Sequence, residues 1–199
     1  MPKGWHVLSR KTPQVDGFAK LGAENYFETW SESARRYRRK WRDEFLDKTY
    51  SIEQISPKEF DSGYMQSSVG KKLKRLFPDL VARKLAAGVA VELWGARHKD
   101  SGEIVAGVAT ITSPTHRASY YLCGFILEKY ADAPVMVGLM DHWYRRGLEA
   151  NLQYLHFGRF WQKGDPKEWK GFSEFKSKFG LEYIAYPPTL VRLARGKLF

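Results

Sequence analysis

The sequence predicts an α+β protein in which helices flank one mixed, mostly antiparallel sheet. Amphipathic helical segments alternate with short apolar strand segments, a hairpin turn joins two of these strands, and 43% of the 199 residues are hydrophobic. This hydrophobic share is ordinary for a globular protein, and the length fits one domain with room for an extension. We expect an N-terminal extension over residues 1–48 and one core domain over residues 49–199.

The first 48 residues contain one strong helical signal. Residues 1–28 carry scattered Pro and Gly, so we expect irregular structure there. From Trp30 to Asp47, apolar residues recur every three or four positions, which predicts a basic amphipathic helix. Its apolar face comprises Trp30, Ala34, Tyr37, Trp41 and Phe45, and its opposite face carries Arg35, Arg36, Arg38, Arg39, Lys40 and Arg42.

The remaining elements follow in the order strand, two helices, three antiparallel strands, helix, strand, helix, two strands. Asp100-Ser101-Gly102 lies between two apolar runs, and Gly supplies the positive φ that a tight hairpin turn needs. A helix over 133–149 would have Asp132 as its N-cap and Pro134 in its first turn. The other predicted strands cover 49–55, 89–97, 104–112, 118–128, 154–158 and two short segments in 181–192; the other helices begin at Pro57, span 69–87 with an interruption at Pro78, and cover 171–180.

The charge and the composition limit the classes of function. The net charge is +11 and the pI near 9.7, which favours phosphate-bearing partners such as a nucleic acid, a nucleotide-linked substrate or an anionic membrane surface, or serves solubility alone. One cysteine, Cys123, excludes an internal disulfide, and the five histidines show no i, i+4 pair, so we expect no metal. Without a long apolar run or a signal-peptide core, we expect no transmembrane segment and a cytoplasmic location.

Four short motifs carry a resemblance to a known family. They are Gly102–Gly107, an aromatic strand leading to a helix near a Pro (Tyr120–Pro134), His156-Phe157-Gly158, and Phe-Lys-x-x-Phe-Gly at Phe175–Gly180. With the element order, these motifs resemble the GNAT superfamily, specifically its FemAB-like branch, which takes aminoacyl groups from tRNA. The resemblance implies an acyltransferase that moves an aminoacyl group to an amine, such as one in a cell-wall (peptidoglycan) precursor or a peptide.

The resemblance assigns one residue a role in the reaction. The Lys of the last motif, here Lys176, would lie near the donor's acyl ester with Phe175 beside it. Aminolysis of an ester passes through an oxyanion, which a fixed cation stabilises. Alternatively, Phe172, Phe175 and Phe179 form a core stripe that the stem of Lys176 merely covers.

At one loop, this sequence differs from members of the superfamily that use acyl-CoA, and the difference concerns the acyl donor. Enzymes of the superfamily that use acyl-CoA hold its pyrophosphate on a glycine-rich loop at a helix N-terminus. The corresponding residues, Tyr130–Gly138, lack those glycines, and Asp132 would repel phosphate. We therefore expect no cofactor and aminoacyl-tRNA as donor, with acetyl-CoA as the alternative. FemAB enzymes usually carry two such domains, so the acceptor stays open. The oligomeric state stays open as well.

Two further residues are candidate bases. Glu128 ends the aromatic strand, where many GNAT enzymes place the base that deprotonates the attacking amine, although a solvated strand end explains it equally. His156 lies near the end of the following strand and could act as a base near neutral pH, or simply be packed. Gly124 in mid-strand would suit a bulge that splays two strands and opens a slot for the donor.

Two basic segments are candidate tRNA contacts. In the loop 158–164, Arg159, Trp161 and Lys163 combine cations with an aromatic ring, which can pair with a phosphate and stack on a base. The second candidate is the helix face that carries Arg35, Arg36, Arg38 and Arg39, or this face is simply solvated. Two other functions therefore remain open: an acyl-CoA-dependent N-acyltransferase, and a nucleic-acid-binding module without catalysis.

Overall fold

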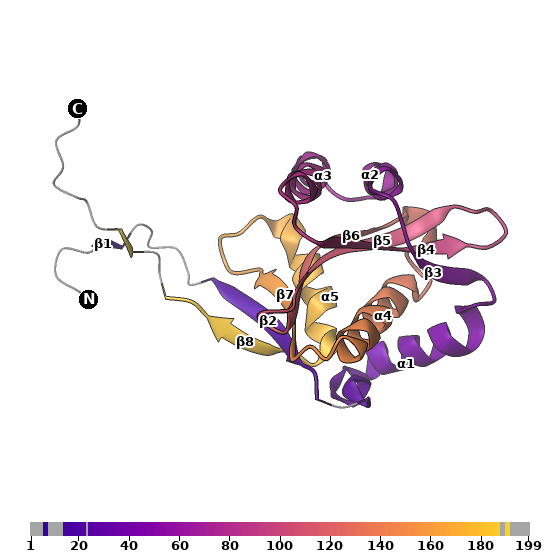
Figure 1. The fold of residues 1–199 in the computed structure, drawn as a ribbon, viewed down its shortest axis with the longest axis horizontal. Coiled ribbons are helices and arrows are strands. Elements are labelled where there is room, and N and C mark those ends of the chain that lie inside the picture. The colour runs from indigo at the N-terminus through magenta and orange to yellow at the C-terminus, as the bar shows by residue number, and fades with distance from the viewer. Residues whose placement is uncertain (1–5, 8–13, 23, 188–189, 192–199) are drawn as a thin grey trace.

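The computed structural model describes residues 6–7, 14–22, 24–187 and 190–191, and its centre is a mixed sheet (Figure 1). Within this part of the chain, all neighbouring strands of the sheet are antiparallel except β6 and β7, which are parallel. In order across the sheet, the seven strands are β3 (Tyr50–Gln54), β4 (Val91–His98), β5 (Ile104–Ser113), β6 (Ala118–Ile126), β7 (Tyr154–Phe160), β2 (Val15–Lys20) and β8 (Glu182–Ala185). A separate strand pair joins β1 (His6–Val7) to β9 (Leu190–Val191). The predicted fold class is confirmed.

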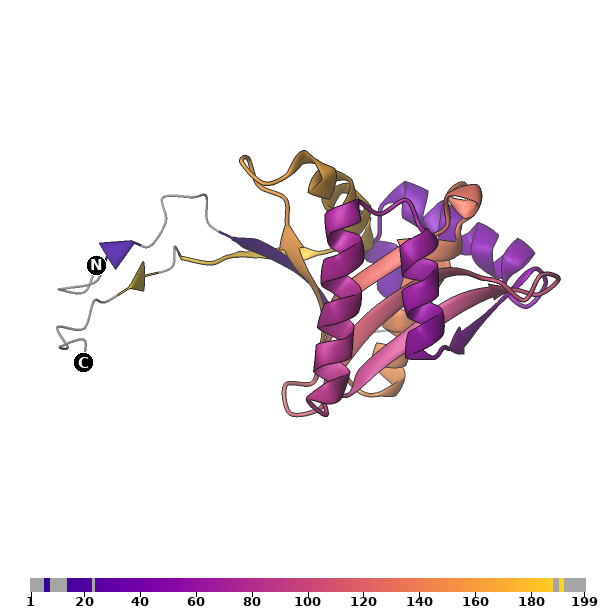
Figure 2. The ribbon, with the colours of Figure 1, turned by 90° about the horizontal axis from the view of Figure 1, so that it is seen from above.

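Helices cover both faces of the sheet. On one face, α2 (Pro57–Gln66) and α3 (Lys71–Ala86) lie side by side, as Figure 2 shows. On the other face lie α1 (Glu32–Lys40), α4 (Val135–Glu149) and α5 (Lys170–Lys176). No helix in the described residues is long and apolar enough to cross a bilayer. Short 3-10 or π segments are η1 (Tyr26–Thr29), η2 (Trp41–Phe45), η3 (Glu128–Tyr130), η4 (Lys167–Trp169) and η5 (Ser177–Phe179).

Most of the helix starts and turns predicted from local sequence are confirmed. Pro57 opens α2, where Ser56 and Glu59 form a capping box. The hairpin turn is also as predicted, with Gly102 at φ +69°. Two details were wrong: α3 runs through Pro78 without interruption, and Asp132 does not cap α4, whose N-cap position is held by Pro134. A proline removes one helical hydrogen bond, but packing of the helix against its neighbours can outweigh that loss.

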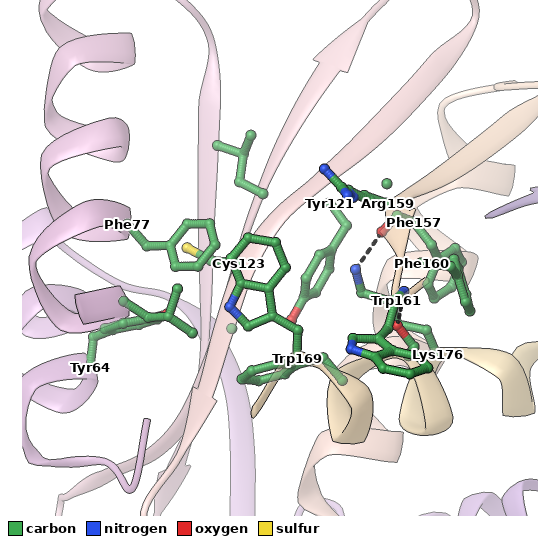
Figure 3. Close-up of a pocket in the computed structure, with 16 residues that line it drawn as sticks. Tyr64, Phe77, Tyr121, Cys123, Phe157, Arg159, Phe160, Trp161, Trp169 and Lys176 are labelled. Atoms are coloured by element: carbon green, nitrogen blue, oxygen red, sulfur yellow. Dashed lines mark hydrogen bonds between the residues drawn. The ribbon is translucent and has the colours of Figure 1, made fainter. Parts of the chain in front are cut away.

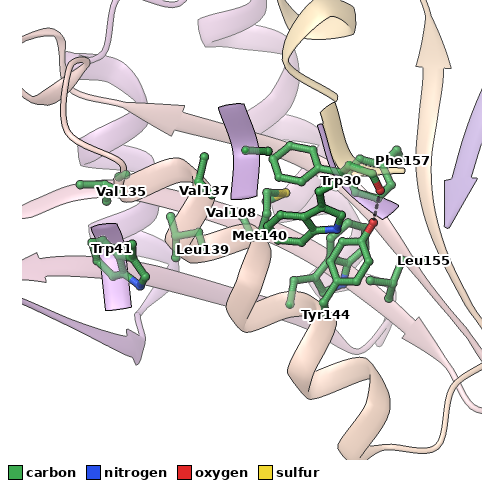
Figure 4. Packing of buried hydrophobic residues seen from close by; sticks show 14 of the residues in the cluster. Trp30, Trp41, Val108, Val135, Val137, Leu139, Met140, Tyr144, Leu155 and Phe157 are labelled. Carbon is green, nitrogen blue, oxygen red and sulfur yellow. Dashed lines mark hydrogen bonds between the residues drawn. The ribbon is translucent and has the colours of Figure 1, made fainter. Parts of the chain in front are cut away.

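The N-terminal segment is more ordered than predicted. Residues 15–20, expected to be irregular, form β2 inside the sheet, paired with both β7 and β8. Trp30 and Trp41 are buried in the same hydrophobic cluster as Val108 of β5 (Figure 4). The boundary predicted at residue 48 therefore falls inside one hydrophobic core.

The buried face of α1 also differs from the prediction. Tyr37, assigned to the apolar face, is exposed, whereas Arg38 is buried and pairs through Nε with Asp141 Oδ1 of α4. Tyr26 Oη donates to the same carboxylate oxygen at 2.6 Å. A buried charge is tolerated where an opposite charge and hydrogen bonds meet it. Arg38 thus joins α1 to α4 and is not part of an exposed basic surface.

Helix α4 also positions the C-terminal elements. Tyr144 Oη donates to the carbonyl oxygen of Phe179 at 2.7 Å, which fixes η5 directly after α5 (Figure 4). Phe179 is fully buried and stacks on Phe157 of β7, with ring centroids 5.8 Å apart. This packing holds α5 against the end of β7, where the candidate site lies.

Candidate active site

Strands β6 and β7 separate to open a cavity. Their parallel pairing covers three residue pairs and ends at Tyr120 and His156. Beyond this point the two strands diverge and border a cavity of about 230 Å³ (Figure 3). In its pairing with β5, β6 also has a bulge near Gly124 that leaves Leu122 as the extra residue. The predicted splay is therefore present.

The cavity wall is formed by α2, α3, β6, β7 with the loop that follows it, η4 and α5. The β6 and β7 sides were expected, but the sequence did not point to the α2 and α3 side chains, because their periodicity indicated only helix packing. The described lining residues are Tyr64, Leu73, Phe77, Tyr121, Leu122, Cys123, Gly124, Phe157, Gly158, Arg159, Phe160, Trp161, Trp169, Phe172, Ser173 and Lys176.

Lys176 brings a positive charge into this cavity. Its Nζ donates to the carbonyl oxygen of Phe157 at 2.7 Å and lies 5.1 Å from the ring centroid of Tyr121. Burial lowers the pKa of Lys176 to about 8, against the opposing effect of the Asp16 carboxylate. The ammonium form therefore persists at neutral pH inside a largely apolar site.

A bulge in β7 explains why the Phe157 carbonyl is available. Opposite β2, Gly17 pairs with Gly158 and Phe18 pairs with His156, so Phe157 is the extra residue. Gly158 has φ +73°, a conformation that glycine adopts without strain. Bulges interrupt the ladder and re-aim backbone groups, often beside active sites.

Asp16 lies beside His156, one of the two candidate bases predicted from the sequence. His156 Nε2 is 3.4 Å from Asp16 Oδ2, and Gln14 donates to Oδ1 of the same carboxylate at 2.8 Å. The pKa of His156 is lowered, mainly by burial and further by Lys176, while Asp16 opposes this shift. His156 does not line the cavity. Asp16 was missed because Gly17 breaks the weak strand pattern around it.

Two other predicted site residues lie apart from the cavity lining. Glu128 is exposed at the first position of η3. Phe175 packs against Phe179, with ring centroids 5.0 Å apart, and so belongs to the core. Phe172, which was assigned to the same core stripe, instead lines the cavity and is 38% exposed.

The predicted basic loop folds back on itself at the cavity rim. Arg159 Nη2 pairs with Asp165 Oδ1 at 2.5 Å, and Trp161 Nε1 donates to the carbonyl oxygens of Asp165 and Pro166. Arg159 and Trp161 line the cavity, and Lys163 is exposed in the same loop. Arg35, Arg36 and Arg39 are exposed on α1 and do not line the cavity.

Residues 23–176 match the acetyltransferase (GNAT) domain family. The chain belongs to the GNAT family. Its parallel β6–β7 pair, splayed beyond Tyr120 and His156, lies inside the matched region. The protein is therefore an acyltransferase by family, as its sequence motifs indicated. No curated protein sequence matches the chain.

Solved structures share this GNAT fold at low sequence identity. FemX has a TM-score of 0.68 at 11% identity, over 90% of this chain and 63% of FemX. L-PGS from Bacillus licheniformis has a TM-score of 0.55 at 13% identity, over 92% of this chain and 62% of L-PGS. The C-terminal domain of a putative lysylphosphatidylglycerol synthetase from Agrobacterium fabrum has a TM-score of 0.56 at 14% identity, over 94% of this chain and 61% of that domain. This chain thus spans about three fifths of each, and the FemAB-like resemblance agrees with the fold.

Backbone donors before α4 of this GNAT domain are already engaged. The N–H groups of Tyr130, Ala131 and Ala133 donate to the carbonyls of Leu127, Glu128 and Tyr130 at 2.9–3.0 Å. Pro134 has no N–H, and Val135 and Val137 are buried. A pyrophosphate cradle needs several free N–H groups that point toward the ligand, and these engaged or missing donors reduce their number in this segment.

Proposed function

We propose that this GNAT domain transfers an aminoacyl group from aminoacyl-tRNA to an amine. The observation that carries the proposal is the Lys176 ammonium, held by the Phe157 carbonyl inside the cavity where β6 and β7 separate. A fixed cation in a water-poor site stabilises developing negative charge far better than a cation in bulk water does.

The reaction follows from this placement. The amine nitrogen attacks the ester carbonyl carbon, and the carbonyl oxygen takes up negative charge close to the Lys176 ammonium. When the tetrahedral intermediate collapses, the C–O bond to the ribose breaks and the new C–N amide bond remains. The proton lost by the attacking nitrogen ends on the ribose oxygen, so no co-reactant is consumed.

Two features favour tRNA as the carrier of the acyl group. The segment before α4 offers few free N–H groups for the pyrophosphate of coenzyme A. In addition, Arg35, Arg36 and Arg39 project from α1 into solvent on a chain of net charge +11, which suits a phosphate backbone.

A comparison of donors tests the proposal. The protein is incubated with labelled aminoacyl-tRNAs or labelled acetyl-CoA and a panel of amines, and alkali-stable amide product is counted. We expect product from charged tRNA and a loss of about 10²–10³-fold for Lys176→Gln. Lys170→Gln, an exposed position on the same helix, is the matched control.

Three outcomes would contradict the proposal. Transfer from acetyl-CoA alone would move the protein to the acyl-CoA-dependent enzymes. Binding of tRNA without turnover of any donor would make it a nucleic-acid-binding module. An unchanged rate for Lys176→Gln would remove the assigned role of this residue.

A further inference from the structure

The two ends of the cavity differ in chemistry (Figure 3). Lys176 and Arg159 lie at the end formed by β7 and α5, together with Trp161. At the opposite end, Tyr64 of α2 and Phe77 of α3 face Cys123 of β6. An ester bound with its carbonyl at Lys176 would extend its acyl group toward this second end.

The second end is apolar and uncharged at neutral pH. Tyr64, Leu73 and Cys123 are all less than 10% exposed, at 1%, 6% and 3%. Burial raises the pKa of the Cys123 thiol to about 12 and raises the pKa of Tyr64 above its ordinary value. Both groups therefore stay neutral, and the rings of Tyr64 and Phe77 pack edge to face with centroids 6.2 Å apart.

The charges that do line the cavity are positive. Among the described lining residues none carries a carboxylate, and the charged ones are Lys176 and Arg159. Arg159 is already paired with Asp165, so Lys176 is the cation that faces a ligand. A lysyl or arginyl side chain would enter this cavity without a counter-charge, which carries a large desolvation cost. An aspartyl or glutamyl side chain would pair with Lys176 and compete with the oxyanion for it.

We infer that the transferred aminoacyl group has an apolar side chain, aliphatic or aromatic, which lies between α2, α3 and β6 against Tyr64 and Phe77. This inference rests on the proposed function and names the class of donor that the same cavity selects. Phe77 is then a specificity-determining residue, because it lies at the apolar end and far along the cavity from the Lys176 ammonium.

Donor analogues with a stable linkage test the selectivity by binding alone. The probes are 3′-amino-3′-deoxyadenosines acylated with phenylalanine, leucine, lysine or aspartate, and adenosine is the reference. In calorimetric titrations of the full chain, the phenylalanyl and leucyl analogues should bind at least about tenfold more tightly than the lysyl and aspartyl ones. The reason is that burying an unpaired charge costs more free energy than losing apolar contacts does. A lysyl analogue that binds as tightly as the phenylalanyl one would overturn the inference.

A pair of variants on α3 locates the selectivity. Phe77→Asp puts a carboxylate into the apolar end and should reduce the preference for phenylalanyl over lysyl by about tenfold or more. Leu76→Asp, at the neighbouring exposed position, should leave the preference unchanged. The wild-type ranking decides the inference without either variant, so a folding defect in one of them does not affect the outcome.

Failure of the inference and failure of the proposed function give different results. If no analogue binds, the panel of charged tRNAs is compared in the transfer assay. No transfer from any of them rejects the proposed function itself. Transfer with lysyl-tRNA or aspartyl-tRNA ahead of phenylalanyl-tRNA rejects the apolar selectivity and leaves the aminoacyl-transfer function standing.

Discussion

Lys176 Nζ lies 2.7 Å from the carbonyl oxygen of Phe157, and this contact joins α5 to the bulge of β7. The ammonium thus donates to a neutral oxygen. Its full positive charge remains available to a developing oxyanion, which a carboxylate partner would have neutralised. The same arrangement explains why burial lowers the pKa of Lys176.

The rate of transfer should fall as the pH rises through about 8. The pKa of Lys176 is lowered from 10.5 to about 8, so the ammonium form dominates below pH 8 and is lost above it. Single-turnover rates, corrected for spontaneous ester hydrolysis, measure this descending limb. A rate that stays constant until the pH approaches 10.5 would show that the site does not perturb this lysine.

Lys176→Met should stabilise the fold while it lowers the rate of transfer. Below pH 8 the lysine is charged in both folded and unfolded states, and only the folded state carries the cost of burying it. We expect a gain of about 1–3 kcal/mol in the free energy of unfolding at neutral pH. This gain should shrink between about pH 8 and 10.5, where the folded lysine is already neutral. Urea denaturation measures it, with Lys170→Met as the exposed control.

Asp141→Ala should destabilise the protein by about 3–5 kcal/mol, because Arg38 would remain buried without its partner. The hydroxyl of Tyr26 would lose its acceptor as well. Arg39→Ala, at the exposed neighbouring position, should change the stability by less than about 0.5 kcal/mol. Chemical denaturation of both variants decides this, and a small effect of Asp141→Ala would mean that water reaches Arg38.

Gly138→Ala should cost about 1–3 kcal/mol. A Cβ at this position would lie 2.2 Å from the indole of Trp41, so the contact between α4 and η2 would have to open. Gly171→Ala in α5 is the control, since a Cβ there meets nothing within 4 Å. The control should stabilise the helix slightly. Thermal and urea unfolding compare the two, and equal effects would contradict the close contact.

The exposed arginines of α1 should determine part of the salt dependence of tRNA binding. Arg39→Gln should reduce the slope of log K against log salt concentration by about 1 if this side chain contacts a phosphate. Arg83→Gln removes an equal charge from α3, where Arg83 pairs with Asp79, and should leave the slope unchanged. Equal slopes for wild type and Arg39→Gln would place the tRNA elsewhere.

The fold was predictable wherever the signal is local. Gly102 in its turn and Pro57 at a helix start depend on neighbours within a few residues, and both were read correctly. Strand β2 was missed because its stability comes from β7 and β8, far along the chain. Arg38 was assigned to the solvent-exposed face of its helix because its partner is distant in sequence. The buried Asp141 carboxylate that accepts its hydrogen bond is 103 residues away.

The candidate site, too, was predictable only where the signal is local. A motif singled out Lys176, and the structure places it in the cavity. Tyr64 and Phe77 gave no signal of their own, since an aromatic residue on an amphipathic helix packs into an ordinary core in most proteins. Their position at the cavity follows from how α2 and α3 pack on the face of β4 to β6, which no local pattern encodes.

The position of β2 has a consequence for the order of folding. This strand is among the first described segments of the chain, yet it pairs with β7 and β8, which are among the last. A chain emerging from the ribosome can form β3 to β6 early, but β2 must wait, unpaired, until those late strands appear. Contacts of such long sequence separation close slowly. Asp16 therefore reaches His156 only after β7 has been synthesised.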